Sequence, residues 1–484
     1  MTAEMESPEA GMPEAGTPRA GQAAPAGGVK VAVFPIDAIG HVNPLLPVVA
    51  ALATRPEVAE VRSFGAAALT ETFTAAGARH VPIDTPPAGP VPASMSELAF
   101  KSFVRPLAII EEMTARAAAF RPDVVLYDVF CVHGLVAARA LGLPSASLVT
   151  FPGYGVLGEH FAVQHGGPHA ELGRANQRYR ELYGLDLLGE GFLPVLFPSG
   201  DLSIVTAVES LSRRVDAVMM PRLRACLSRF EATCEFVGPS VGAVRFTPEP
   251  VAAPGRRSDG GVPGAASAGS GAHDRFAAEF PYALLDRARR DGRSIVLFSL
   301  GTVLTDFRFD SPVGGAPTGR AYLMALLDRL TAALGDREDL LVVAATGSVL
   351  AAADEPKWPD NFVVRAFLPQ RELLEGHAGA FITHHGTGST AESILAGVPM
   401  VSVPGAGDQI PNAEIAISAG AAVALWDPHD VFATMDAGLL ERAVRQALRD
   451  PSHREACLAL RRRMAAAGGA ERAARLVAEL AGRS

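Results

Sequence analysis

Short runs of β-branched and other apolar residues alternate with longer helical patterns along both halves of the chain. In the first half the expected strands lie at residues 29–35, 60–65, 123–128 and 145–150. In the second half they are "SIVLFSLG", "DLLVVAATG", "NFVVRAF", "GAFITHH" and "VPMVSVP". Apolar strands separated by helices are typical of parallel sheets that are covered on both faces. The sequence therefore predicts an α/β fold of two doubly wound parallel-sheet domains, with a cleft at the carboxyl ends of their strands.

Two segments that are poor in large apolar side chains divide the chain. Residues 1–28 and the stretch "PEPVAAPGRRSDGGVPGAASAGSGAHD" at 248–274 consist mainly of small, proline and charged residues. Such segments cannot bury enough apolar surface to offset the entropy of ordering. We expect a disordered tail over 1–28, an N-terminal domain over 29–238, a flexible linker over 239–292 and a C-terminal domain over 293–484.

Charge and cysteine content exclude several classes of protein. A formal net charge of -9 argues against nucleic acid as a partner. The cysteines form neither a paired framework nor a C-x-x-C motif, so we expect reduced, mostly buried thiols at Cys131, Cys226, Cys234 and Cys457. No apolar run approaches the roughly 20 residues that cross a bilayer, and the N-terminus lacks a signal-peptide pattern. We therefore expect a cytoplasmic monomer or homodimer that binds small ligands.

A glycine-rich turn lies between the expected strand "GAFITHH" and the helix that follows it. Gly386, Gly388 and Ser389 let backbone amides approach a ligand, and the amino end of a helix favours phosphate. His384 directly precedes the turn, and Glu392 lies about one helical turn after Ser389. The imidazole and hydroxyl can donate to phosphate oxygens, while the carboxylate can accept from two ribose hydroxyls. These residues predict a nucleoside diphosphate site; an ordinary tight turn is the alternative.

The same turn also fits a dinucleotide site. "GTGSTA" matches G-x-G-x-x-A, and Asp408 lies about 20 residues beyond it. However, His384 and Glu392 suit one ribose and a diphosphate better, and Asp408 follows a "PGAG" turn instead of ending the strand. An NAD-dependent enzyme is therefore the less favoured hypothesis.

His41 in "GHVNP" is the candidate general base. Asn43 and Pro44 form a good N-cap and first-turn pair, so we expect the helix to begin after His41 and to leave the histidine on a loop at the end of the first strand. A histidine in a loop can also be a simple surface or capping residue. Asp128 ends the strand "DVVLYD" at the same sheet edge and could orient the imidazole, or could cap the next helix. Asp37 is a weaker candidate for the partner.

The stretch "AFLPQRELLEGHAGAFITHHGTGSTAESILAGVPMVSVPGAGDQIPN", from Ala366 to Asn412, resembles the nucleotide-sugar signature of family 1, UDP-dependent glycosyltransferases. "GHVNP" is similar to the motif that carries their general base. The resemblance implies the GT-B fold of two facing Rossmann-like domains, of the bacterial macrolide and natural-product type. The N-terminal domain would bind the acceptor, and the last helix is a candidate to pack back on it. His41 would be the catalytic base and Asp128 its partner.

The remaining correspondences concern the nucleotide sugar. The resemblance implies that Gly301 and Thr302 of "SLGT" bind the nucleotide sugar. The resemblance implies contacts to the nucleobase from Phe367, Pro369 and Gln370, to the diphosphate from His384, Gly386, Gly388 and Ser389, to the ribose from Glu392, and to the sugar from Asp408 and Gln409. Phe367 stands where many relatives have Trp, and Gly388 replaces the Asn of plant members.

The resemblance implies an inverting transfer of a hexose, with glucose expected, from a UDP-sugar to a hydroxyl of an apolar acceptor. A macrolide, polyketide or flavonoid-like compound is expected, in antibiotic biosynthesis or resistance. The irregular stretch 151–213 would line the acceptor site or form core. Because thymidine diphosphate offers Glu392 no 2'-hydroxyl, UDP is favoured. A TDP-deoxysugar transferase and a non-catalytic nucleotide-sugar-binding helper protein are the alternatives.

No metal or other cofactor is expected. No Asp-x-Asp occurs in the chain, and this is the motif with which glycosyltransferases of the other major fold hold a metal ion. His160, His165 and His169 are a less favoured metal cluster, because the intervening "GGP" interrupts helical spacing.

Overall fold

The structure is a computed structural model. It describes residues 27–84, 90–92, 95–157, 161, 164–165, 167, 169–215, 221–243, 280–301, 304, 310, 312–347, 357–425, 431–434 and 436–482. The segment 248–274 and nearly all of the predicted tail lie outside the described residues.

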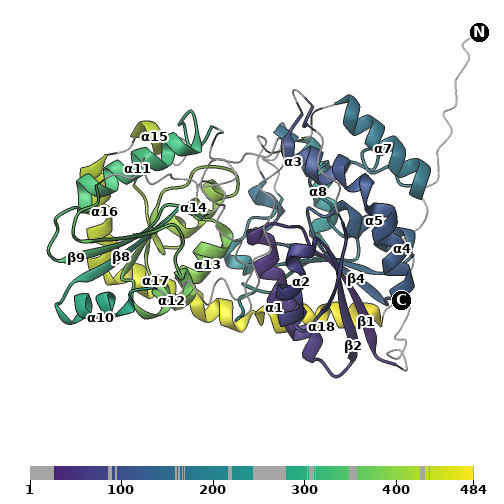
Figure 1. The fold of residues 1–484 in the computed structure, drawn as a ribbon, viewed down its shortest axis with the longest axis horizontal. Coiled ribbons are helices and arrows are strands. Elements are labelled where there is room, and N and C mark those ends of the chain that lie inside the picture. The colour runs from purple at the N-terminus through teal and green to yellow at the C-terminus, as the bar shows by residue number, and fades with distance from the viewer. Residues whose placement is uncertain are drawn as a thin grey trace, which may run out of the picture.

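Two parallel sheets form the centres of two lobes (Figure 1). The N-terminal sheet has the strand order β3-β2-β1-β4-β5-β6-β7, and the C-terminal sheet has the order β10-β9-β8-β11-β12-β13. All neighbouring strands pair in parallel. The predicted fold class is therefore confirmed.

The strands of the first sheet are β1 (Val29–Phe34), β2 (Val58–Gly65), β3 (Arg79–Pro82), β4 (Val124–Asp128), β5 (Ser145–Val149), β6 (Leu202–Val205) and β7 (Cys234–Phe236). Those of the second are β8 (Ser294–Ser299), β9 (Leu340–Ala345), β10 (Phe362–Arg365), β11 (Ala380–Thr383), β12 (Met400–Ser402) and β13 (Ala422–Val423).

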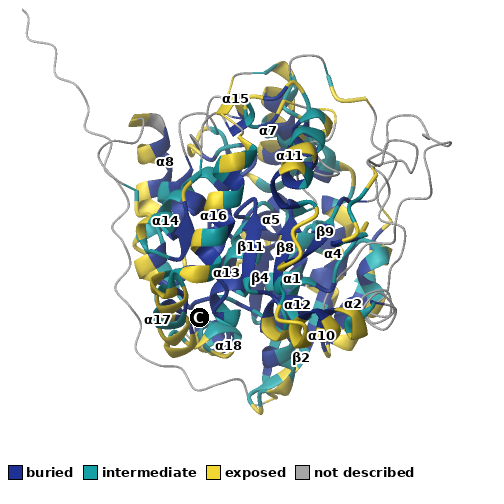
Figure 2. Ribbon diagram, turned by 90° about the vertical axis from the view of Figure 1, so that its left-hand side faces the viewer, coloured by how far each residue is buried: buried dark blue, intermediate teal, exposed yellow. Residues whose placement is uncertain are grey.

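Helices cover both faces of each sheet, and the buried strands lie between helices whose outer sides are exposed (Figure 2). The first lobe has α1 (Ile39–Thr54), α2 (Thr70–Ala75), α3 (Glu97–Ala99), α4 (Ile110–Phe120), α5 (Val132–Ala140), α7 (Ala170–Tyr183) and α8 (Pro221–Glu231). The second half of the chain has α10 (Tyr282–Arg290), α11 (Gly319–Leu334), α12 (Gln370–Gly376), α13 (Thr387–Ala396), α14 (Gln409–Ser418), α15 (Val431–Thr434), α16 (Ala437–Arg449), α17 (Pro451–Ala466) and α18 (Gly469–Ala481). No described helix is long and apolar enough to cross a membrane.

The side chains of β1 show why both faces need a cover. Val31 and Val33 belong to the core under α1 and α18, whereas Ala32 and Phe34 belong to the core under α4 and α5. Successive side chains of a strand point to opposite faces, so an apolar strand requires a helix layer on each side.

The sequence analysis did not identify β3, β6, β7 and β13. These strands are two to four residues long. Three of them also contain polar or charged residues, as in "RHVP", "LSIV" and "CEF". Tertiary pairing, at the sheet edges for β3, β7 and β13 and between β5 and β7 for β6, makes them strands.

Two helices lie in a domain other than the segment to which the expected boundaries 239–292 and 293–484 assign them. The segment 239–292 contains α10, whose Leu285 and Ala288 are buried in one core cluster with Ile295 and Leu297 of β8. At the other end, the chain leaves α17 in the C-terminal lobe and returns to the N-terminal lobe as α18, which packs on α1 (Figure 1). The last helix therefore completes the core of the first domain.

Val477 tests this packing because it is fully buried between α18 and the N-terminal sheet. Val477→Asp would bury an unpaired carboxylate, and we expect it to lower the free energy of unfolding by roughly 3 kcal/mol or more. Urea denaturation followed by circular dichroism measures the change. Arg475→Ala, on the exposed side of the same helix, should leave the midpoint nearly unchanged; equal midpoints for the two variants would show that α18 does not contribute to the core.

Candidate active site

His41 lies in the first turn of α1, at the carboxyl end of β1. The helix begins at Ile39, and Ala38 is its N-cap with an extended backbone (φ -147, ψ 130). The prediction that His41 precedes the helix is therefore wrong. Pro44 lies inside the helix and removes only the hydrogen bond that its N–H would make to the carbonyl of Gly40, so the helix can start before the Asn-Pro pair.

Asp128 holds the imidazole of His41. Its Oδ2 lies 2.8 Å from Nδ1 of His41, and its Oδ1 accepts the backbone N–H of Phe130 at 2.9 Å. Asp128 is fully buried, whereas 20% of the His41 side chain is exposed. An Nδ1–H that donates to the carboxylate leaves the lone pair on Nε2, which is the form required of a base. Asp128 does not cap α5, whose N-cap is Cys131.

The pKa of His41 is raised above its usual value. Burial alone would lower the pKa, but the charge of Asp128 and its hydrogen bond outweigh burial. Asp408 of the C-terminal domain adds to the increase. The two domains therefore bring His41 and Asp408 close enough to interact electrostatically across the cleft.

His384 directly follows β11, at the carboxyl end of the C-terminal sheet and on the other side of the cleft from His41. Its ring is buried against two glycines, because a Cβ on Gly301 or Gly386 would lie 2.6 or 2.5 Å from ring atoms. Nδ1 lies 3.4 Å from the carbonyl oxygen of Ser299. Burial lowers the pKa of His384 to about 4, so the imidazole is neutral at neutral pH. His385 is also neutral, since burial lowers its pKa to about 3, and it has a left-handed backbone (φ 60).

The residues assigned to the nucleobase and ribose meet at the start of α12. Gln370 Nε2 donates to Oγ of Ser389 (3.2 Å) and to Oε2 of Glu392 (2.8 Å). Pro369 is buried at the N-cap of α12, and Phe367 is half-buried just before it. The segment before α12 and the first turns of α13 therefore form one continuous surface.

Asp408 and Gln409 have different surroundings. Asp408 Oδ2 accepts hydrogen bonds from Thr387 Oγ1 (3.2 Å) and Asn412 Nδ2 (3.1 Å). Burial raises the pKa of Asp408, while these hydrogen bonds and His41 oppose the increase. Gln409 is buried, and its Oε1 accepts the N–H groups of the preceding "PGAG" turn. Gln409 thus braces the loop that presents Asp408 and has only its amide nitrogen left for a ligand.

The structure brings most of the predicted site residues to this cleft but not all. Gly388 lies in the first turn of α13 between Thr387 and Ser389 and is exposed, whereas Thr302 and His160 lie outside the described residues. His165 Nδ1 is bonded to Ser96, and Nδ1 of His169 accepts an N–H at the start of α7. No group of three metal-ligating side chains is present in the described part of the chain. Asp37 is exposed in the loop after β1.

Four residues that contribute to the site were not predicted. Thr150 Oγ1 lies 3.1 Å from Nδ1 of His41, and Phe130 contacts the ring of His41 edge to face, with centroids 4.9 Å apart. Thr387 and Asn412 bind Asp408. Phe130, Thr387 and Asn412 each lie within a few residues of a predicted site residue, whereas Thr150 is the last residue of an expected strand.

Aromatic rings extend from the base into the N-terminal domain. The centroid of Phe130 lies 6.1 Å from that of Phe151 and 6.5 Å from that of Phe161. Phe130 and Phe161 are half-buried. The surface beside His41 is therefore partly aromatic.

Known proteins share both the sequence signature and the fold. Residues 334–464 match the family model described as UDP-glucoronosyl and UDP-glucosyl transferase. The NDP-glycosyltransferase YjiC of Bacillus licheniformis is 24% identical over 465 residues, which cover 93% of this chain and 96% of that protein. The uncharacterized UDP-glucosyltransferase YojK of Bacillus subtilis is 29% identical over 138 residues, 28% of this chain. That alignment spans only 33% of YojK.

Solved glycosyltransferases share the architecture over nearly the whole chain. The glycotransferase of kitacinnamycin superposes with a TM-score of 0.65 at 24% identity, covering 94% of this chain and 99% of that one. CalG4, the calicheamicin glycosyltransferase, gives a TM-score of 0.63 at 22% identity with the same coverage. These matches establish the two-domain fold, and the family model covers the nucleotide-sugar signature. The chain therefore has the GT-B fold, and its residues 334–464 match the UDP-glucoronosyl and UDP-glucosyl transferase family.

Proposed function

We propose that this protein is an inverting glycosyltransferase that moves a hexose, with glucose expected, from a UDP-sugar to a hydroxyl of an apolar acceptor. One observation carries the proposal. His41, hydrogen-bonded to the buried Asp128 of one domain, lies across the cleft from Asp408 of the other, whose Oδ2 accepts a hydrogen bond from Thr387 in the first turn of α13.

The chemistry follows from this arrangement. Nε2 of His41 removes the proton of the acceptor hydroxyl, and Asp128 stabilises the imidazolium that forms. The acceptor oxygen attacks the anomeric carbon from the face opposite the diphosphate. The new bond to the acceptor forms as the bond to the diphosphate oxygen breaks, so the configuration inverts and UDP leaves as an anion.

Groups at the amino end of α13 would stabilise the leaving UDP. We assign this role to the N–H groups of the first turn, Ser389 and His384, and the resemblance adds Thr302 to them. Preorganised donors act most strongly where charge develops in the transition state. In this mechanism the chain supplies the stabilisation itself, and no metal ion or other cofactor is required.

The nucleotide assignment depends on Glu392. Its carboxylate is bonded to Gln370 and would accept from the ribose hydroxyls, where only uridine has a 2'-hydroxyl. A TDP-sugar donor is the second candidate, because two structural neighbours, VinC and the spinosyn rhamnosyltransferase SpnG, were crystallised with thymidine diphosphate. NAD and a non-catalytic role fit the site less well, since neither uses the His41–Asp128 pair.

The acceptor assignment depends on the aromatic surface beside His41. Phe130 and Phe161 favour an apolar, partly planar molecule with a hydroxyl group. Relatives named for kitacinnamycin and calicheamicin support a natural product of the macrolide, polyketide or flavonoid-like kind.

Thermal unfolding with added ligands tests the donor. A ligand at roughly 100 times its Kd stabilises the folded state by about 2.7 kcal/mol, so UDP should raise the melting temperature more than TDP or NADH does. Glu392→Leu should remove the preference for UDP over TDP. Glu375→Ala, an exposed glutamate on α12, is the control. A larger stabilisation by TDP in the wild type would favour the second candidate, and stabilisation by NADH alone would contradict the proposal.

The pH dependence of sugar transfer tests the base. His41 must be unprotonated to act, and its pKa is raised, so the rate should increase with pH through a value above the usual histidine pKa. Asp128→Asn removes the charge that raises the pKa, so the acid limb should move to lower pH while the plateau rate falls by roughly a hundredfold or more.

Asp436→Asn is the matched control for this profile. It neutralises a carboxylate at the N-cap of α16 but leaves a side chain that can cap the helix. Its profile should equal that of the wild type. An acid limb that stays in place in Asp128→Asn would show that His41 is not the titrating base.

A further inference from the structure

Asn412, on α14 one helical turn after Asp408, joins three parts of the site through one amide. Its Nδ2 donates to the carbonyl oxygen of His385 (2.9 Å), to Oδ2 of Asp408 (3.1 Å) and to Oγ1 of Thr387 (3.2 Å). The side chain is only 3% exposed. The three acceptors therefore lie close together around a single nitrogen. Since an amide NH₂ has only two protons, two of the acceptors share one proton.

The chemistry of the partners fixes the orientation of this amide. The carbonyl of His385 and the carboxylate of Asp408 are acceptors, so a flipped amide would place oxygen against oxygen. In the observed orientation Oδ1 is buried and has no hydrogen-bond partner among the described residues. A buried acceptor without a partner is unfavourable. The amide therefore leaves its own acceptor unpaired while its nitrogen donates to three neighbouring groups.

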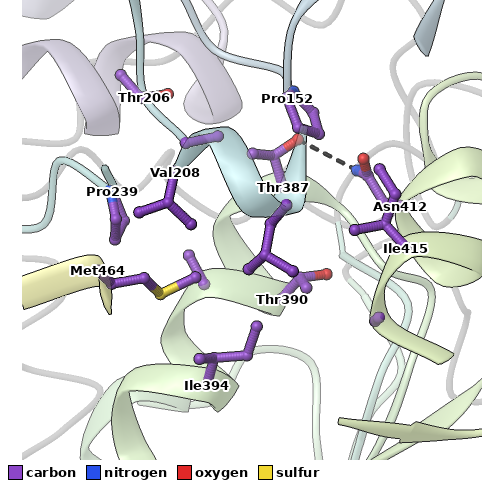
Figure 3. A pocket seen from close by; sticks show the side chains of 14 residues that line it. Pro152, Thr206, Val208, Pro239, Thr387, Thr390, Ile394, Asn412, Ile415 and Met464 are labelled. Carbon is purple, nitrogen blue, oxygen red and sulfur yellow. Dashed lines mark hydrogen bonds between the residues drawn. The ribbon is translucent and has the colours of Figure 1, made fainter. Parts of the chain in front are cut away.

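An apolar pocket between the domains borders this network (Figure 3). It contains about 440 Å³ of empty space, part of which is open to solvent. Val208 of the N-terminal domain and Ile415 of α14 contribute to its wall, as do Thr387 and Asn412. On the side that faces the pocket, Thr387 and Asn412 have few packing neighbours. Their hydrogen bonds therefore hold them in place there.

We propose that Asn412 is a positioning residue for the sugar of the donor. It holds the Asp408 carboxylate at a set distance from the turn that leads into α13. This inference rests on the proposed function, in which Asp408 binds sugar hydroxyls and the turn binds the diphosphate. His385 has a left-handed backbone in that turn, and its carbonyl and Asp408 are anchored on the same nitrogen. Without the amide both binding groups remain, but their separation can vary.

Asn412→Leu removes the three hydrogen bonds and adds apolar volume beside the pocket. We expect its affinity for UDP-glucose to fall roughly tenfold and its affinity for UDP to fall less than about threefold, because UDP has no sugar for Asp408 to bind. Calorimetric titration of the full chain with both ligands measures this difference. Thermal unfolding checks that the variant is folded, and the smaller Asn412→Ser is measured in parallel. Ile415→Val alters the same pocket but not the network and should retain wild-type affinities.

A double-mutant cycle with Asp408→Ala separates a positioning role from a general structural one. If Asn412 acts through Asp408, the double variant should bind UDP-glucose no more weakly than Asp408→Ala alone. Additive losses, or equal losses for UDP and UDP-glucose, would overturn the positioning role and leave the proposed function intact. A wild-type protein that binds neither ligand would overturn the proposed function, and this inference with it.

Discussion

The pairing of β1 with β4 at the centre of the N-terminal sheet is the constraint on which the site depends. Phe34 lies opposite Tyr127 in this parallel register, so the two strands end side by side. His41 and Asp128 follow from those ends, although 87 residues separate them in the chain. Helices on both faces bury the strands, which in turn buries Asp128 and gives its hydrogen bond a surrounding with little water.

Two carboxylates from different domains act on the same imidazole. Asp128 lies behind His41 and is bonded to Nδ1, while Asp408 acts from across the cleft. Burial opposes the charged form of the histidine, and the two carboxylates favour it. Of the two carboxylates, Asp128 raises the pKa of His41 more than Asp408 does. The chain crosses back to the N-terminal domain before α18, and α18 packs on α1. The two domains are therefore linked a second time, by the chain itself and by this packing.

Besides the carboxylates of Glu392 and Asp408, the C-terminal half of the site uses neutral, preorganised groups. His384 and His385 are buried and uncharged at neutral pH. Gln370 ties Ser389 to Glu392, and Gln409 braces the loop before Asp408. Such groups need little reorganisation when a diphosphate binds or leaves. In the inference above, the amide of Asn412 positions Asp408 and the turn before α13, so its loss would change the separation of these groups.

The sequence by itself determined the α/β class, the strands with continuous apolar residues, and the residue types at the ends of β1, β4 and β11, because these signals are local. It could not determine the short strands β3, β6, β7 and β13, which form through pairing with neighbouring strands. It also could not determine the start of α1, which follows the extended Ala38 and precedes the Asn-Pro pair. Only the tertiary structure decided that Gln409 braces a loop and that Thr150, Thr387 and Asn412 join the site. Hydrogen bonds between segments distant in the chain depend on how helices and sheets pack, and no local pattern of residues contains that information.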